Sequence, residues 1–289
     1  MNVRKAVILA AGYGTRFLPA TKAIPKEMLP ILDRPAIQYI VDEAVASGID
    51  HIVIVTSAHK AAIEAHFTPD RALEQFLEEK HAESALADVR RIASRALFSF
   101  VLQERALGTA NALLQARHVI GDEPFAVFYP DDIIASKVPA LRQLMDVHNE
   151  RAGSVLALHR LPREEVVHYG VIDPETLAER IHRVKAVIEK PSVASAPSNL
   201  TIVGRFILTP DVWSVIERTP AGVGGELFLT DTFGLLAAGG YPILGYEYEG
   251  DWLDIGRPVG LLKASIHIAL ARNGLRDELR SYLRSLRIN

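Results

Sequence analysis

The densest group of residues that could bind a polyphosphate lies directly after the first apolar run of the chain, residues 6–11. Residues 12–30 contain two glycines, three prolines and the cations Arg16, Lys22 and Lys26. Backbone N–H groups at glycines, together with fixed cations, form a concavity that attracts anions. Open α/β sheets also bind their ligands at the carboxyl ends of strands. We therefore expect this loop to hold a polyphosphate; the alternative is a surface loop whose cations are only solvated.

Two better-known nucleotide motifs do not fit the same loop. A dinucleotide-binding fingerprint needs glycine or alanine at its sixth position, where the helix packs closely on the strand, and this chain has Phe17 there. A P-loop needs Gly-Lys-Ser or Gly-Lys-Thr at a fixed distance after its first glycine, and the loop lacks that pattern. A nicotinamide dehydrogenase and a P-loop NTPase are therefore disfavoured.

Three aspartates form a second group that could do chemistry. Asp131 and Asp132 follow the apolar run 125–129, and Asp254 is an isolated carboxylate in an apolar segment. A buried charge must be paired or must bind a metal. Carboxylates from separate parts of a chain, without His or Cys, suit a magnesium ion shared with phosphates. For the neighbouring pair alone, an Asx turn or a helix cap is the commoner role.

An acid and a base, Glu189 and Lys190, stand next to each other at the end of an expected strand. Neighbours in a strand point to opposite faces of the sheet, so only one of the two would face a shared site. Residue chemistry alone therefore indicates an exposed polar edge.

The composition excludes several classes of function. The chain has 289 residues, 49% of them hydrophobic, no cysteine and a formal net charge of −3. Without cysteine there is no disulfide, no Cys-ligated zinc and no thiol nucleophile, and an acidic balance does not supply the basic face that nucleic acid requires. No stretch approaches the roughly 20 apolar residues of a membrane span, and the N-terminus lacks a secretory signal. We expect a cytoplasmic protein with neither nucleic acid nor membrane as a partner.

The elements that must position these residues alternate as in α/β proteins. A strand over 6–11, a helix over 36–47 and a strand over 51–56 form a βαβ unit, which predicts a parallel sheet. From residue 259 onward the apolar residues recur at helical spacing, which predicts an amphipathic tail that packs on a neighbouring subunit. Further helical stretches are expected over 69–95 and 109–117, and further strands over 98–102, 125–129, 154–159, 169–173, 183–189 and 202–208, with some of the later strands antiparallel.

These motifs, in their order along the chain, resemble those of the bacterial UTP:glucose-1-phosphate uridylyltransferase family. Residues 11–30 match the signature of that family almost letter for letter. The further matches span nearly the whole chain: Gln103-Glu104, Leu107-Gly108, 125–132, 169–171, 188–191, 196–200, 203–205, 225–227, 229–231 and 254–256. The resemblance implies transfer of a uridylyl group from UTP to glucose 1-phosphate, giving UDP-glucose and pyrophosphate, with Mg2+ as cofactor. We also expect a homo-oligomer, a dimer or tetramer.

The resemblance further implies a three-layer, Rossmann-like nucleotide-diphospho-sugar transferase fold of class α/β. Its central sheet would be mixed and mainly parallel. The chain would be a single domain, 1–289, with a nucleotide-binding half over 1–135, a sugar-binding half over 136–258 and a helical tail over 259–289 as the subunit contact.

By position, the resemblance also assigns roles to individual residues. Asp131 and Asp254 would hold the metal, and the catalytic cations would be Arg16 and Lys26 at the triphosphate and Lys190 at the sugar phosphate. The nucleotide would contact Ala11, Gly12, Gly14, Thr15, Glu27, Gln103, Gly108 and Asp132. The sugar would contact Tyr169, Gly170, Glu189, Lys190, Val203 and Gly204, with Glu189 on its hydroxyls.

One segment departs from the family pattern. Where the family usually reads Gly-Leu-Gly-His-Ala, residues 106–111 read Ala-Leu-Gly-Thr-Ala-Asn, which is closer to other sugar-nucleotide pyrophosphorylases. A changed lining near the base could redirect the choice of nucleotide, so a thymidylyltransferase or another sugar-1-phosphate nucleotidyltransferase is the alternative. A catalytically inactive sugar-nucleotide-binding regulatory subunit is the alternative from another class; it predicts loss of the cations or carboxylates, and all of them are present.

Overall fold

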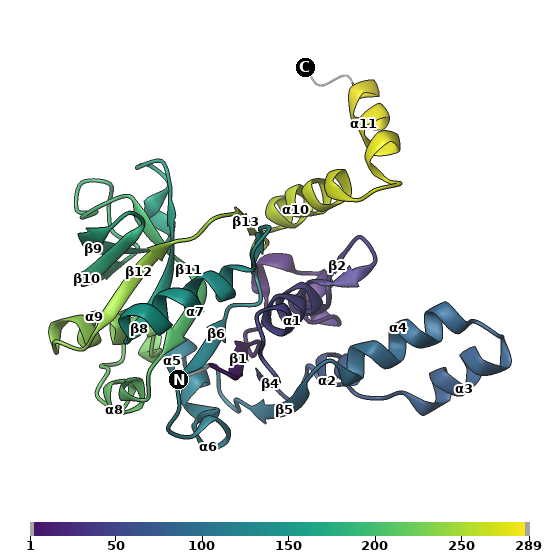
Figure 1. The fold of residues 1–289 in the computed structure, drawn as a ribbon, viewed down its shortest axis with the longest axis horizontal. Helices are drawn as coiled ribbons and strands as arrows, with labels where there is room; N and C mark the ends of the chain where they lie inside the picture. The colour runs from purple at the N-terminus through teal and green to yellow at the C-terminus, as the bar shows by residue number, and fades with distance from the viewer. Residues whose placement is uncertain (1–2, 287–289) are drawn as a thin grey trace.

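The computed structural model describes residues 3–286, and a mixed nine-stranded sheet forms its centre (Figure 1). One half of the sheet is parallel, as the alternation of apolar runs and helices predicts. It contains β5 (Leu97–Leu102), β4 (His51–Thr56), β1 (Lys5–Leu9) and β6 (Phe125–Phe128), in this spatial order. In β1, the neighbours Val7 and Ile8 point into separate hydrophobic cores, so the strand is buried on both faces.

The other half of the sheet is mostly antiparallel. β11 (Leu200–Leu208) runs antiparallel to β6 and to β8 (Ser154–Arg160), and β12 (Ile243–Glu247) is parallel to β8. β10 (Ile181–Glu189) runs antiparallel to β12 and to β9 (Gly170–Ala178). At Thr201 and Val171, β11 also meets β9, so this half curls back on itself like a barrel.

The prediction of a mainly parallel sheet is therefore wrong. Within residues 3–286 the central sheet has four parallel and five antiparallel strand pairings. The reason lies in the connections: helices join the strands of the first half, whereas only Glu179 and Arg180 separate β9 from β10. A two-residue connection can join only antiparallel strands, because a parallel pair needs a crossover of a dozen or more residues.

Helices cover both faces of the sheet. One core contains side chains from α1 (Ala36–Ala46) and α7 (Ala140–Arg151). The other contains side chains from α5 (Thr109–Gln115), α8 (Asp211–Ile216) and α9 (Leu229–Ala238). Smaller elements complete this body: α6 (Arg117–Ile120), the paired strands β2 (Pro30–Ile31) and β3 (Arg34–Pro35), and the short 3-10 helices Val166–His168 and Val223–Gly225.

Two helical arms extend from this body. The helical stretch predicted over 69–95 is a hairpin of α3 (Arg71–Glu79) and α4 (Glu83–Ser94), which follows α2 (Ala61–Phe67) (Figure 1). The predicted tail is α10 (Pro258–Ala271) and α11 (Arg276–Ser285), and α11 has no buried residue. Residues 287–289 of that tail, and residues 1–2 of the predicted nucleotide-binding half, lie outside the described residues. None of the helices in 3–286 has the length and apolar character needed to cross a membrane.

Candidate active site

The loop after β1 folds back on itself through three short 3-10 helices, Thr15–Phe17, Ala20–Lys22 and Lys26–Met28. Gly14 is left-handed, with φ of 66°, and a Cβ there would lie 3.0 Å from Cβ of Lys26. Thr21 Oγ1 donates to the carbonyl oxygen of Gly14 at 2.9 Å. Only glycine combines this backbone conformation with so close an approach without strain, so Gly14 is what lets the cationic side of the loop turn toward the sheet.

A buried ion pair holds this loop against the sheet. Glu27 is 2% exposed, and both of its carboxylate oxygens accept from Nζ of Lys60, at 3.0 and 2.9 Å. Lys60 also donates to the carbonyl oxygen of Ala10 at 2.7 Å. A buried charge needs such a partner, and the pair fixes the loop to the end of β1.

The strand ends bring the three aspartates together. β6 leads into Asp131, and β7 (Asp132–Ala135) pairs with β13 (Asp251–Asp254) so that Asp132 lies opposite Asp254. The position that a Cβ on Gly256 would occupy is 3.3 Å from Oδ2 of Asp131 and 3.0 Å from Oδ1 of Asp254. The guanidinium of Arg16 is also 3.3 Å from that point. Glycine at 256 therefore leaves open the space around which two carboxylates and one cation converge.

The pKa values of Asp131 and Asp132 are shifted in opposite directions. Nζ of Lys26 lies 2.6 Å from Oδ2 of Asp131. Burial alone would raise the pKa of Asp131, but the Lys26 ammonium holds the pKa of that carboxyl below its usual value. Burial, with the nearby charges of Asp131 and Asp254, raises the pKa of Asp132 to about 7. Burial and the like charges of Asp131 and Asp254 thus disfavour ionisation of Asp132, and a further cation among the three carboxylates would lower its pKa.

The three carboxylates differ in their hydrogen bonds and in their exposure. Trp252 Nε1 donates to Oδ1 of Asp132 at 2.8 Å, and the backbone N–H of Gly204 donates to its Oδ2 at 2.9 Å. Both oxygens of Asp254 accept as well, from the backbone N–H of Gly256 and the hydroxyl of Tyr169. Asp132 is buried, however, whereas Asp131 and Asp254 are partly exposed, so these two remain as candidate metal ligands. The described residues contain no group of three or more His, Cys, Asp or Glu side chains that could enclose a metal ion on their own. One or two carboxylates completed by substrate phosphates and water are the usual surroundings of Mg2+, so this pair fits that ion.

A pocket of about 330 Å3, which we call the loop pocket, lies between the loop after β1 and the start of α5. Gly108 precedes α5 with φ of 93°, and a Cβ there would lie 2.4 Å from the carbonyl oxygen of Leu227. This close approach closes one wall of the pocket. The lining residues are Leu9, Ala11, Gly12, Tyr13, Gly14, Thr15, Gln103, Ala106, Gly108, Thr109, Ala112, Glu226 and Phe228.

A second pocket of about 300 Å3, the carboxylate pocket, adjoins the first and shares Thr109 and Phe228 with it. Tyr169 donates its hydroxyl to Oδ2 of Asp254 at 2.9 Å and so links the pocket wall to the acidic cluster. The lining residues are Arg16, Thr109, Tyr129, Asp131, Asp132, His168, Tyr169, Gly170, Glu189, Lys190, Ile202, Phe206, Phe228, Thr230, Trp252 and Asp254.

Glu189 and Lys190 both line the carboxylate pocket, although neighbours in a strand point apart. β10 ends at Glu189, opposite Gly170 of β9, and Lys190 adopts a left-handed conformation with φ of 46°. Because the strand ends between them, the alternation of faces no longer applies. Nζ of Lys190 lies 3.2 Å from Oε1 of Glu189. Both side chains therefore line one pocket, and the Lys190 side chain is also 57% exposed, in agreement with a polar edge.

A family model described as nucleotidyl transferase matches residues 5–270. The chain belongs to this nucleotidyl transferase family. Among its relatives, the UTP–glucose-1-phosphate uridylyltransferase of Staphylococcus haemolyticus is 45% identical over 285 residues, which cover 99% of each chain. The Bacillus subtilis protein of the same name is 44% identical and covers 99% of this chain and 97% of its own.

Solved structures of the family superpose over almost the whole chain. A UTP-bound UGPase from Acinetobacter baumannii has a TM-score of 0.91 and 35% identity, and the match covers 99% of this chain and 100% of that one. A UDP-glucose pyrophosphorylase complexed with UDP-glucose has a TM-score of 0.86 and 38% identity, covering 93% of this chain and 100% of that one. Every residue that lines the two pockets lies inside the segment matched by the nucleotidyl transferase model, and α11 lies outside it.

The two pockets of this nucleotidyl transferase bring together most of the residues singled out in the sequence. Lys26, Glu27, Val203 and Gly204 line neither: Lys26 pairs with Asp131, Glu27 with Lys60, Val203 is buried and Gly204 holds Asp132. Sequence reasoning did not single out the lining residues Thr109, Tyr129, Glu226, Phe228, Thr230 and Trp252. Five of them stand in or directly beside a stretch that matches the family, and Trp252 stands two residues before Asp254.

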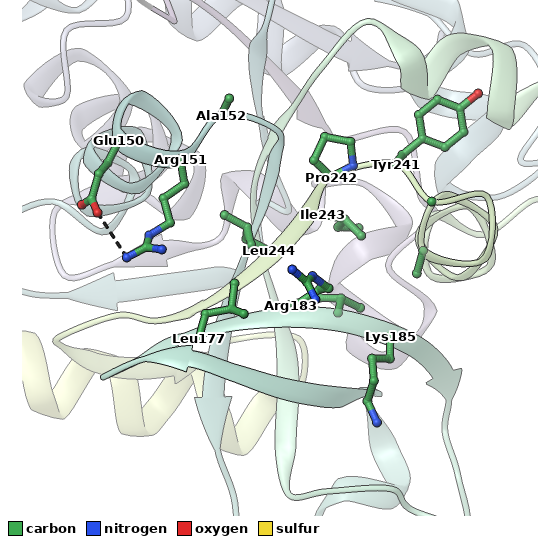
Figure 2. Close-up of a pocket in the computed structure, with 13 residues that line it drawn as sticks. Glu150, Arg151, Ala152, Leu177, Arg183, Lys185, Tyr241, Pro242, Ile243 and Leu244 are labelled. Carbon is green, nitrogen blue, oxygen red and sulfur yellow. Dashed lines mark ion pairs between the residues drawn. The ribbon is translucent and has the colours of Figure 1, made fainter.

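A larger cavity, of about 880 Å3, shares no lining residue with either pocket. Figure 2 shows its wall, formed by the end of α7, by β10 and by the residues between α9 and β12. Its cations are paired: Arg183 with Glu175 at 2.8 Å, Lys185 with Asp173 at 2.9 Å, and Arg151 with Glu150 at 3.2 Å. Because these cations already have carboxylate partners, the larger volume of this cavity does not indicate a phosphate site.

Proposed function

We propose that the protein transfers the uridylyl group of UTP to α-D-glucose 1-phosphate and so forms UDP-glucose and pyrophosphate. The observation that carries this conclusion is that uridylyltransferases match this chain over almost its whole length, and that the chain has a site suited to their two substrates. Two adjoining pockets share Thr109 and Phe228, and the second of them contains Arg16 and the three aspartates. A nucleotide and a sugar phosphate are two separate ligands that must meet at their phosphates, and the arrangement supplies a place for each.

In this reaction the nucleotide occupies the loop pocket and the sugar occupies the carboxylate pocket. Arg16 and Lys26 neutralise the triphosphate, Glu189 accepts from sugar hydroxyls, and Lys190 binds the sugar phosphate. A phosphate monoester is mostly dianionic at pH 7, so an oxygen of the sugar phosphate can attack the α-phosphorus in line without a general base. Holding both ligands in line is thus the main task of the site.

We propose Mg2+ as the cofactor, with Asp131 and Asp254 as its protein ligands. Their convergence beside Gly256, next to a third carboxylate, Asp132, supports this assignment. When bound, Mg2+ neutralises charge that develops on the phosphate oxygens. Lys26 holds Asp131 ionised, and Tyr169 orients Asp254.

We also assign the chain the three-layer, Rossmann-like nucleotide-diphospho-sugar transferase fold, because helices cover both faces of its sheet. The division into a nucleotide-binding half over 1–135 and a sugar-binding half over 136–258 stays a prediction. It agrees with the loop pocket, most of whose lining comes before residue 136. A cytoplasmic location also stays a prediction.

A pyrophosphate-release assay over UTP, dTTP, CTP and GTP, each with several sugar 1-phosphates, tests the proposed reaction. We expect the highest kcat/KM with UTP and glucose 1-phosphate, and UDP-glucose as the product identified by mass. A preference for dTTP would instead support the thymidylyltransferase alternative, which the departure at residues 106–111 favours. No turnover with any pair would refute the assignment.

Replacing Lys190 should impair the use of the sugar phosphate more than that of the nucleotide. A charge-assisted hydrogen bond to the phosphate is lost in Lys190→Ala, so the KM for glucose 1-phosphate should rise about tenfold or more while the KM for UTP stays nearly unchanged. The matched control is Lys185→Ala in β10, which ends just before Lys190; Lys185 lines the larger cavity and its ammonium pairs with Asp173. Equal effects of Lys190→Ala on both KM values would contradict the assignment.

We propose that the tail joins subunits of a homo-oligomer, a dimer or tetramer. Val259, Leu262 and Tyr282 are 57%, 60% and 59% exposed on α10 and α11, which extend from the body (Figure 1). Because Tyr282 packs on little within the chain, Tyr282→Glu should leave the melting temperature unchanged and lower the sedimentation coefficient. The control Phe76→Glu alters an equally exposed aromatic residue on α3 and should change neither. A wild-type monomer at working concentration would argue against the contact.

A further inference from the structure

The amide of Gln103, in the wall of the loop pocket, is hydrogen-bonded to the protein through its nitrogen alone. Nε2 donates to Oδ1 of Asn111 at 2.9 Å and to the backbone oxygen of Gly108 at 3.3 Å. An amide nitrogen carries two hydrogens, and both are used here. Gln103 is only 7% exposed, so little of the side chain can exchange these partners for water.

The oxygen of the same amide is left for a ligand. No donor within residues 3–286 bonds to Oε1 of Gln103, and the one fully buried side-chain N or O atom without a partner in that part of the chain is Oγ1 of Thr56. Oε1 is therefore accessible, and since Gln103 lines the loop pocket, this access is from the pocket.

Two acceptors fix the amide in this orientation. The carbonyl of Gly108 can only accept, so it favours the nitrogen of Gln103 over the oxygen on that side. Its distance of 3.3 Å is long, whereas the contact with Asn111 is at the usual length. Asn111 lies in the first turn of α5, within the segment 106–111 that departs from the family pattern. The stronger of the two restraints therefore comes from Asn111.

We infer that Asn111 is a positioning residue that sets base selectivity by holding the Gln103 carbonyl toward the base. The inference rests on the proposed function. Uracil and thymine present an N3–H donor to this oxygen, whereas N3 of cytosine is an acceptor and would face it with like charge. A site built to hydrogen-bond one partner strongly rejects an analogue that leaves its groups unpaired. Asn111 thus selects for bases with N3–H and does not distinguish uracil from thymine.

Substitution of Asn111, with kcat/KM measured for UTP, dTTP and CTP, tests this role. Asn111→Leu removes the acceptor at similar size and lets the amide turn over, so the preference for UTP over CTP should fall about tenfold. Asn111→Asp keeps an acceptor and should retain the preference. Asn111→Ala, which suits a helix, gives a second variant without the acceptor in case the leucine is not accommodated. The ratio of UTP to dTTP should stay constant throughout.

The matched control is Asn149→Leu on the exposed side of α7, which should not change the ratio of UTP to CTP. An unchanged ratio in both Asn111→Leu and Asn111→Ala would overturn the inference while wild-type synthesis of UDP-glucose still supported the function. Equal loss in Asn111→Asp and Asn111→Leu would also overturn it, since the acceptor would then be irrelevant. Absence of UDP-glucose from the wild-type protein would be a failure of the proposed function instead.

Discussion

Asp131→Asn should lower kcat/KM for UDP-glucose formation by about a hundredfold or more and raise the Mg2+ concentration needed for half-maximal activity. Asparagine keeps the shape of the side chain but removes one of the two carboxylates that converge beside Gly256. It also leaves the Lys26 ammonium, 2.6 Å away, without its counter-ion. Removing one preorganised electrostatic group from an active site commonly costs about a hundred- to a thousandfold in rate.

The measurement is a Mg2+ titration of initial rate at saturating UTP and glucose 1-phosphate. Asp122→Asn, in the exposed loop before β6, makes the same chemical change outside the site and should leave the titration as in the wild type. A normal Mg2+ dependence in Asp131→Asn would remove this residue from the metal site. The melting temperature of both variants shows whether the fold is kept.

Lys26→Ala should lower kcat/KM for UTP by about a hundredfold. The ammonium lies at the junction of the nucleotide loop and the acidic cluster, where it pairs with Asp131 and faces the position of the triphosphate. Its loss removes a cation from the proposed phosphate site and the counter-ion of a partly exposed carboxylate at the same time. The proposed contact of Lys26 is with the triphosphate, whereas the sugar phosphate is assigned to Lys190, so the KM for glucose 1-phosphate should change much less.

Steady-state kinetics with each substrate varied in turn separates the two effects. Lys22→Ala is the matched control, because Lys22 belongs to the same loop but is exposed and lines neither pocket. A similar loss in Lys22→Ala would show that the total charge of the loop matters and not the position of one ammonium. An unchanged KM and kcat in Lys26→Ala would contradict the assignment of the triphosphate site.

The sequence could indicate how the loop after β1 is built because the information for it is local. Gly14 and Lys26 are close in the chain, and a short loop with glycines and prolines has few conformations in which both can face the end of β1. The buried strands β1, β4 and β6 were predicted for the same reason, since an apolar run of five or six residues between turns already indicates a strand buried on both faces.

The buried ion pair that holds this loop on the sheet could not be predicted from local sequence. Glu27 resembles a nucleotide-binding residue by its place in the signature, but its carboxylate is buried against Lys60, which lies between β4 and α2. The sequence alone does not show whether a carboxylate in a loop faces a ligand or forms a buried ion pair with a lysine. Only the packing of the loop on the sheet decides between these two environments.

The sequence by itself determined the chemistry of this protein: a cationic glycine loop, isolated aspartates after apolar strands, and no cysteine or basic face. The tertiary structure alone decided that Asp131 and Asp254 share one space, that Glu189 and Lys190 face one pocket, and that antiparallel pairings outnumber parallel ones. The physical reason is the separation along the chain between the residues that interact. Residue types and local periodicity are fixed along the chain, whereas strand partners, the end of a strand and the burial of a charge depend on contacts between segments that are far apart in sequence.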